Sequence, residues 1–449
     1  MPFRRFKHRT SIVGGLVVVF VLAVALWFAP FGSRVGAQQS TVIIPNIPSV
    51  PAGSAYRQTN LVSDWPGLAP VQNPLLVNPW GLTATASSPF WVANNGTSTS
   101  SLVSGDVSGS PVVTVAAMPF VTIPGGLPTG TVANGVATEF VLPGPCASAP
   151  CSARFLFASI TGNIVGWNPN APAASSTSGV VGATHPGHVY TGLAIGASSG
   201  GNRLYAADFA NGAIDVYDTS FNLLPGGTFA DPTIPNVPPG NVYHPFNVQN
   251  IGGLIYVTYA KVDPITGLSA SGDGNGFVRR FSTDGVKDGL FNINGNTTNH
   301  LNAPWGITLA PASFGVLSGD LLVGNFGEGS PSINAFSTTF GAFQATMNDE
   351  SANPVVIDEL WALKFGNGGA GGDINTLYFA AGIGEEEHGL FGSLKPTTAT
   401  ATSLVQFGSD TFAIGEGSGH IDITVTRGGD ASGNASVNVS TFDESLPDH

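Results

Sequence analysis

The feature that most constrains this chain is a short signature that returns at near-constant spacing. An aromatic or small residue is followed by glycine or its equivalent and then by an aliphatic residue. The six copies are Trp80-Gly81-Leu82, Asn134-Gly135-Val136, Thr191-Gly192-Leu193, Phe246-Asn247-Val248, Trp305-Gly306-Ile307 and Trp361-Ala362-Leu363. Their middle residues are separated by 54, 57, 55, 59 and 56 positions. A unit of this length has room for about four short strands and their turns.

An apolar run follows each signature and ends in small polar residues. These runs occupy residues 89–96, 154–162, 203–212, 254–261, 320–329 and 376–384. A small sheet that is apolar on both faces cannot bury them alone, whereas sheets stacked around an axis bury every face. The repeat therefore predicts an all-β, six-bladed β-propeller over residues 56–394, and residues 56–64 are expected to close the ring with the last blade. A parallel β-helix is the alternative, but its coils are shorter and more regular.

The N-terminus has the anatomy of a secretory signal peptide. Basic residues precede an apolar run over 12–31, and small residues then predict cleavage after Ala37. An uncleaved membrane anchor is the alternative, because a run of about 20 apolar residues can span a bilayer. In both cases the remainder is expected outside the cytoplasm, with residues 38–55 as an extended linker.

The charge of the mature chain limits its partners. Residues 1–37 hold five of the 15 basic residues and no acidic ones, which leaves 10 basic against 28 acidic residues and a net charge of −18. Phosphate binding requires a basic face, so nucleic acid is not an expected partner. A protein or glycan ligand at the cell surface is expected instead, and membrane contact only through an uncleaved N-terminal segment.

The chain has two cysteines, Cys146 and Cys151. In an oxidising compartment a pair this close is expected to form a local disulfide. A metal or redox role would require more ligands or a CxxC spacing.

The composition changes near Lys395. A Thr/Ala linker is predicted over 395–404, and residues 405–449 alternate apolar and polar side chains as in the opening strands of an incomplete β-sandwich.

Two resemblances follow from these motifs. The tail resembles a Calx-beta domain through Phe412, Glu416, Gly419, the Ile-x-Ile-x-Val strand, Arg427, Gly429 and Thr441-x-Asp443. That resemblance implies Ca²⁺ ligands at Glu416 and Asp443, although the later acidic ligands of the module are absent. The body resembles a family of exported bacterial propeller proteins through NPWGL, NAPWGI and an AAG…HGLFG ending, and more loosely the NHL-type and gluconolactonase-like propellers.

Polar residues recur at one offset after three of the apolar runs. Asn94, Asp208 and Asn325 occupy equivalent positions, and equivalent loops of a propeller converge at the mouths of its channel. Oxygen ligands of this kind bind hard cations such as Ca²⁺. The alternative is that these side chains satisfy backbone groups of turns in their own blades.

Three weaker candidates lie elsewhere in the propeller. Glu385-Glu386-Glu387-His388 has the residue types for metal binding or acid–base chemistry, but a solvated acidic loop is the commoner meaning. His244 and His300 precede consecutive signatures and are predicted to face one mouth. Residues 271–276, with Asp273 and Asn275, lack most EF-hand ligands, so a hairpin turn is favoured.

The sequence contains no catalytic signature such as GxSxG, HExxH or a phosphate-binding loop. We therefore expect a non-catalytic binding or scaffold module at the cell surface or in an extracellular matrix. The alternative is a metal-dependent hydrolase or lactonase at the channel mouth, with Asn94, Asp208, Asn325 and His300 as candidate ligands.

Overall fold

The computed structural model describes residues 53–147, 150–397, 404–407 and 425–428. The chain divides into two units, one spanning 50–400 and one formed by the two ends of the chain. Within the described residues the regular structure is β-strand apart from one 3₁₀ turn, η1 (Gly315–Leu317). None of these residues forms a helix with the length and apolar character needed to cross a membrane.

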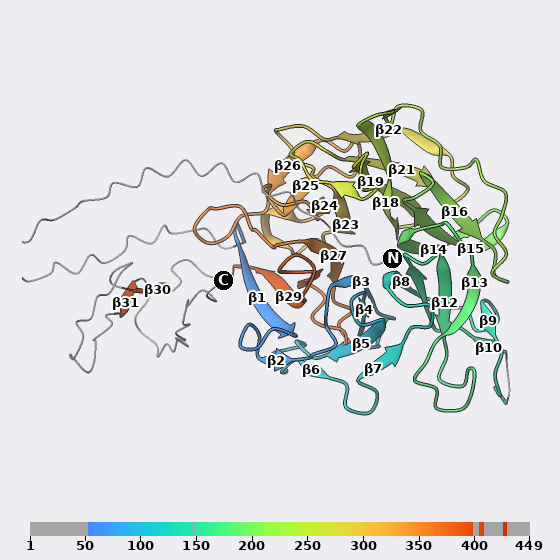
Figure 1. The fold of residues 1–449 in the computed structure, drawn as a ribbon. Helices are drawn as coiled ribbons and strands as arrows, with labels where there is room; N and C mark the ends of the chain where they lie inside the picture. Colours follow the sequence, from blue (N-terminus) through green and yellow to red (C-terminus); the bar gives the residue numbers. More distant parts are fainter. Residues whose placement is uncertain (1–52, 148–149, 398–403, 408–424, 429–449) are drawn as a thin grey trace, which may run out of the picture. The chain divides into compact units, whose positions relative to one another are not determined.

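Six sheets, antiparallel apart from one two-residue parallel pairing in the last blade, stand around a common axis (Figure 1). Blade 1 contains β3 (Pro79–Thr83), β4 (Phe90–Asn94), β5 (Thr99–Ser104), β6 (Val113–Thr114) and β7 (Phe120–Thr122). Blade 2 contains β8 (Pro128–Ala133), β11 (Phe155–Ser159), β12 (Asn163–Trp167) and β13 (Val180–Thr184), with the added pair β9 (Val141–Leu142) and β10 (Cys151–Ser152). Blade 3 contains β14 (Tyr190–Ser198), β15 (Gly201–Asp208) and β16 (Ala213–Tyr217).

The second half of the ring follows the same order. Blade 4 contains β17 (Asn236–Val237), β18 (Asn241–Ile251), β19 (Leu254–Val262), β20 (Ser269–Ala270), β21 (Phe277–Ser282) and β22 (Lys287–Asn294). Blade 5 contains β23 (Pro304–Leu309), β24 (Leu321–Asn325), β25 (Ile333–Phe336) and β26 (Phe343–Thr346). Blade 6 contains β27 (Leu360–Phe365), β28 (Leu377–Ala381), β29 (Leu390–Pro396), β1 (Tyr56–Ser63) and β2 (Val71–Gln72).

The first strand of the propeller closes the ring. β1 pairs antiparallel with β29, in a register that runs from Tyr56↔Pro396 to Ser63↔Leu390. The last blade is therefore completed by a strand from the start of the chain. The predicted six-bladed fold and its closure by residues 56–64 are both confirmed.

The innermost strand of each blade carries the repeated signature, with one correction. Five copies lie on β3, β14, β18, β23 and β27, but the copy predicted at Asn134-Gly135-Val136 is wrong. Those residues follow β8, whose own register places Thr129-Gly130-Thr131 in the equivalent position, because Pro128 pairs with Ser159 as Pro79 pairs with Asn94.

The signature glycines allow neighbouring inner strands to approach each other. A Cβ on Gly81 would lie 2.5 Å from the Thr129 carbonyl oxygen, and one on Gly306 would lie 2.6 Å from that of Trp361. Blade 4 has Asn247 instead of glycine, and its amide donates a hydrogen bond of 2.8 Å to the carbonyl of Trp305. The six inner strands therefore surround a very narrow axis.

The core consists of apolar layers between consecutive blades. Leu156 and Leu204 share one layer between blades 2 and 3, and Leu322 and Phe379 share another between blades 5 and 6. All four side chains are fully buried. Burial of a leucine or phenylalanine side chain contributes about 1.5–3 kcal/mol, so each blade is stabilised mainly by its neighbours.

In the second unit, β30 (Leu404–Phe407) pairs antiparallel with β31 (Val425–Gly428). The predicted signal peptide over 1–37 and the Calx-beta residues Glu416 and Asp443 lie outside the described residues. The predicted C-terminal sandwich is not shown.

Candidate functional site

Tryptophan side chains block the axial channel. Trp80 stacks on Trp361 with 3.5 Å between ring centroids, and the Trp305 ring lies edge-on to both. The indole N–H groups of Trp80 and Trp361 donate to Asn78 Oδ1 at 3.1 and 2.9 Å. The void that remains between the inner strands is about 20 Å³, which is room for about one water molecule. An organic ligand therefore has no place inside the channel.

Asn94, Asp208 and Asn325 end the second strand of their blades. Asp208 Oδ1 accepts a hydrogen bond of 3.0 Å from the Val189 amide, and Asn325 Oδ1 accepts one of 2.9 Å from the Asn302 amide. Asn94 donates through Nδ2 to Ser101 Oγ at 2.7 Å. Among the described residues, no hydrogen bond or ion pair joins any two of the three. Each side chain serves its own blade, so the structure does not assemble them into a ring of ligands.

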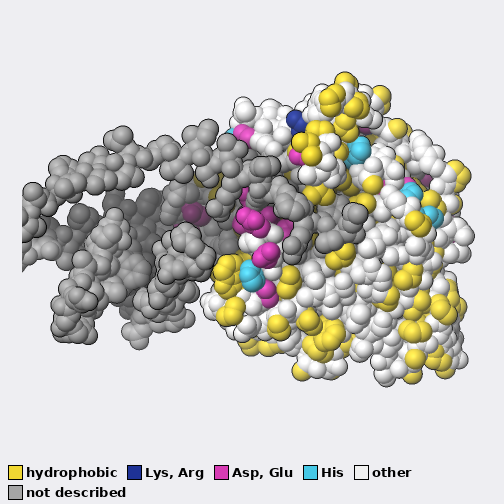
Figure 2. All heavy atoms as spheres, viewed as in Figure 1, with side chains coloured by type: hydrophobic (Ala, Val, Ile, Leu, Met, Phe, Trp, Pro, Cys, Tyr) yellow, Lys and Arg dark blue, Asp and Glu magenta, His cyan; other side chains and the backbone are white. Residues whose placement is uncertain are grey.

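The inner strands all begin at one face of the propeller, which we call the strand-start face. Second strands end there and third strands begin there. The described histidines are His185, His188, His244, His300 and His388, and all lie on turns or strand ends of this face. On the face drawn in Figure 2, a group of carboxylate side chains lies beside one histidine, and further histidines lie apart from this group.

The histidines predicted from the sequence have separate partners on this face. His244 Nδ1 lies 2.6 Å from the Phe209 carbonyl, and His300 Nδ1 lies 3.1 Å from both carboxylate oxygens of Asp273. His388 Nδ1 lies 2.8 Å from Asp64 Oδ2. His244 and His300 are therefore not joined in one site.

The two other candidate segments, residues 385–388 and residues 271–276, also form hydrogen bonds with their own neighbours and do not converge on one site. Glu386 accepts a hydrogen bond from Asn78 Nδ2 at 3.0 Å, and its backbone amide donates to Glu359 Oε2 at 2.7 Å. Asn275 lies in the turn between β20 and β21 and accepts a hydrogen bond of 3.2 Å from the Tyr243 hydroxyl.

Asp208 instead belongs to a cluster that the sequence did not reveal. His188 Nδ1 lies 2.7 Å from Asp208 Oδ2 and 2.8 Å from Asp215 Oδ2. The Tyr190 hydroxyl donates to Asp215 Oδ2 at 2.8 Å and lies 2.6 Å from that of Tyr217. All of these residues come from blade 3 and the turn that precedes it.

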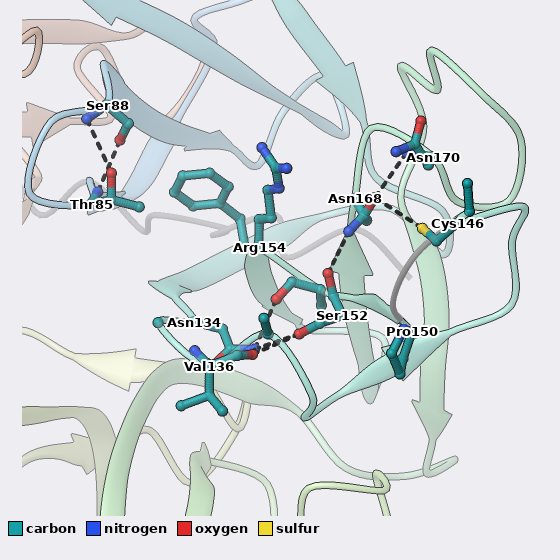
Figure 3. A pocket seen from close by; sticks show the side chains of 15 residues that line it. Thr85, Ser88, Asn134, Val136, Cys146, Pro150, Ser152, Arg154, Asn168 and Asn170 are labelled. Atoms are coloured by element: carbon teal, nitrogen blue, oxygen red, sulfur yellow. Dashed lines mark hydrogen bonds between the residues drawn. The ribbon is translucent and has the colours of Figure 1, made fainter.

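A cavity of about 490 Å³ lies between blades 1 and 2, where their inner strands end (Figure 3). The turn after β3 contributes Thr85 and Ser88, and the long segment between β8 and β11 contributes most of the remaining wall. Within this segment, a disulfide joins Cys146 to Cys151 beside the cavity. A cavity of this size suits a small organic ligand.

Arg154 is the one charged residue among those that line the cavity. Within the described part of the chain its exposed guanidinium has no hydrogen-bond or ion-pair partner. Neighbouring amides are already engaged: Asn134 Nδ2 donates to the Ala153 carbonyl at 2.9 Å, and Asn168 Nδ2 donates to that of Ser152 at 2.6 Å. An unpaired cation in a cavity without carboxylates is suited to an anionic group.

Comparisons with known proteins found relatives of this chain by sequence. No family model matches the chain. It is 33% identical over 345 residues to "Uncharacterized protein R648" of Acanthamoeba polyphaga mimivirus, covering 76% of this chain and 81% of that protein. It is 32% identical over 346 residues to "Uncharacterized protein L690" of the same virus, covering 76% of this chain and 86% of that protein.

Solved structures share less with the chain. A streptogramin B lyase is 12% identical, with 76% of this chain and 97% of that chain covered and a TM-score of 0.41. A gluconolactonase from Xanthomonas campestris is 14% identical, with 54% and 82% covered and a TM-score of 0.31.

The strand order, the closing strand and the blocked channel define a six-bladed β-propeller with its open cavity away from the axis. The chain belongs to the same protein family as R648 and L690 of Acanthamoeba polyphaga mimivirus.

Proposed function

We propose that this chain is an exported, non-catalytic binding module whose propeller binds an acidic glycan in the cavity between blades 1 and 2. The observation that carries the proposal is the unpaired guanidinium of Arg154 in a cavity lined by no carboxylate. The separate partners of the candidate ligands support it, because the alternative hydrolase would need those side chains to converge on one metal ion at the channel mouth.

The lining of the cavity matches the chemistry of a sugar acid. A guanidinium forms paired, charge-assisted hydrogen bonds with a carboxylate or sulfate. Thr85 and Ser88 line the cavity from blade 1 and Asn170 lines it from blade 2, so their hydroxyls and carboxamide can contact the hydroxyls of a sugar from two sides. The net charge of −18 on the mature chain repels extended polyanions, so a short oligosaccharide fits better than a long one.

Replacement of Arg154 by glutamine is expected to weaken binding of a glucuronate-terminated oligosaccharide about ten- to a hundredfold. This range corresponds to the loss of about 1.5–3 kcal/mol from a hydrogen bond to a charged group. Titration calorimetry on the purified chain measures the affinity, and the same oligosaccharide ending in glucose should bind the unchanged chain as weakly as the acidic one binds Arg154→Gln.

The matched control is Arg203→Gln, which removes the same charge from blade 3, away from the cavity. It should retain the affinity of the unchanged chain. Equal binding by Arg154→Gln and Arg203→Gln, or no binding of the acidic oligosaccharide by the unchanged chain, would reject the proposal.

The location outside the cytoplasm is part of this proposal and is tested separately. We expect the exported chain to begin at Gln38, because a signal peptidase recognises the small residues up to Ala37. N-terminal sequencing of the secreted protein measures this, and an intact N-terminus retained in the membrane fraction would favour the anchor instead.

The C-terminal segment is proposed to be Calx-beta-like through Glu416 and Asp443. Because the later acidic ligands of that module are absent, calcium titration of the full chain is expected to show affinity weaker than micromolar. Micromolar binding that is lost in Glu416→Gln would overturn this expectation.

A further inference from the structure

We infer that His188, Asp208 and Asp215 bind a divalent metal ion, for which zinc is the best fit, on the strand-start face of blade 3. One ligand atom from each residue lies within 4.8 Å of the other two. This site does not depend on the proposed glycan cavity, which lies between two other blades at the ends of their inner strands.

The contacts of the imidazole ring are the first argument for a cation. His188 Nδ1 lies within hydrogen-bonding distance of both Asp208 Oδ2 and Asp215 Oδ2. A ring nitrogen carries at most one hydrogen, so it cannot donate a full hydrogen bond to two carboxylates. A metal ion at this position would interact with all three atoms at once. Bonds of about 2.0–2.2 Å to each atom require only a small outward movement of the side chains.

Burial is the second argument. The side chain of Asp208 is 0% exposed and that of Asp215 is 13% exposed. Two carboxylates that converge in a site shielded from water repel each other strongly unless positive charge compensates them. No lysine or arginine among the described residues forms an ion pair with either carboxylate, and His188 is the single basic group in contact with them.

Neighbouring groups hold the three ligands in place. Asn211 Nδ2 donates to Asp208 Oδ2 at 2.6 Å, and the Tyr190 hydroxyl donates to Asp215. Supporting hydrogen bonds of this kind orient the ligands of metal sites and raise their affinity.

The ligand set indicates which metal fits. One imidazole nitrogen and two carboxylate oxygens suit zinc, whereas calcium prefers six to eight oxygen ligands. The His188 side chain is 27% exposed, so solvent can reach the site. Three protein ligands with an accessible further position leave room for water or for a donor group of a partner.

The experiment is a zinc titration of the full chain after removal of metals with a chelator. We expect one zinc ion per chain, with micromolar or tighter affinity by calorimetry. His188→Gln and Asp215→Asn should each weaken that affinity at least tenfold. His300→Gln is the matched control, because it changes a histidine beside Asp273 on the same face and should leave the affinity unchanged.

Asp208→Asn is not the decisive variant, because Asp208 also accepts the Val189 amide and its loss can impair folding. The melting temperature of the unchanged chain should rise with added zinc, while that of His188→Gln should not respond. A chain that binds no stoichiometric zinc, or variants that bind it as the unchanged chain does, would show that the three residues form a hydrogen-bonded cluster only.

Discussion

Replacement of Asp231 by asparagine is expected to lower the free energy of unfolding by about 3–5 kcal/mol, since it leaves a buried guanidinium without its counterion. The Asp231 side chain is fully buried, and the Arg279 side chain is 2% exposed. Arg279 Nε lies 2.6 Å from Asp231 Oδ2, and Lys287 Nζ lies 3.0 Å from Oδ1. Arg279 Nη1 donates to the carbonyls of Val278 and Ile293, and Nη2 donates to Asn294 Oδ1 at 2.8 Å. None of these acceptors carries a compensating charge.

The same ion pair should make stability depend on pH. Burial alone would raise the pKa of Asp231, but hydrogen bonds from Thr233, Arg279 and Lys287 outweigh it and lower the pKa to about 2. Because the folded pKa lies below the unfolded value of about 3.9, the contribution is complete above about pH 5 and is lost as the pH falls toward 2. Its size is about 2.5 kcal/mol, and roughly half of it should be gone at pH 3.

Urea unfolding at pH 6 and pH 3 measures both effects. Asp231→Asn should be less stable at pH 6 and should lose less on acidification than the unchanged chain. Asp288→Asn is the control, because Asp288 pairs with Arg280 on the same blade but is 30% exposed. Exposed pairs contribute about 0–1 kcal/mol. If the two variants were equally stable, the pair at Asp231 would not have the strength that its burial implies.

The fold could be predicted from the sequence because it depends on a repeated pattern. Apolar runs at a spacing of about 55 residues specify sheets that need neighbours, whatever their loops contain. Trp80, Trp305 and Trp361 mark their strands clearly, because a tryptophan at the same position of three inner strands packs at the axis. Blade 2 has Thr129 at that position, so its inner strand has no aromatic residue to identify it. The sequence pattern was therefore assigned to the next suitable glycine, Gly135.

The candidate sites were harder to predict from the sequence, because their residues come together only when the blades fold. Equal offsets placed Asp208 and Asn325 correctly at the ends of equivalent strands, but each accepts a hydrogen bond from a backbone amide just before the inner strand of its own blade and does not approach the other. His188 and Asp215 lie in different elements and meet Asp208 only after blade 3 has folded. Arg154 lines a cavity built by two blades. The scarcity of basic residues after position 37 was the one available signal for Arg154.

The corrected position of the signature in blade 2 leads to the second large effect. Gly130→Ala is expected to lower the free energy of unfolding by about 3 kcal/mol, at the upper end of the range for overpacking. A Cβ on Gly130 would lie 2.2 Å from the Leu193 amide nitrogen and 2.6 Å from the Gly192 carbonyl carbon. These are backbone atoms of β14 in the next blade, which cannot rotate away as a side chain can. The inner strands of blades 2 and 3 would have to separate within a closed ring.

Gly135→Ala provides the matched comparison, because Gly135 is the residue that the sequence pattern had assigned to this role. A Cβ there would meet no atom within 4 Å, and the backbone does not adopt a positive φ. The free energy of unfolding of Gly135→Ala should therefore stay within about 0.5 kcal/mol of that of the unchanged chain. Equilibrium urea unfolding of the two variants distinguishes the assignments. A large loss for Gly135→Ala with none for Gly130→Ala would mean that β8 is not the inner strand of blade 2, since only the glycine on the inner strand lacks room for a methyl group.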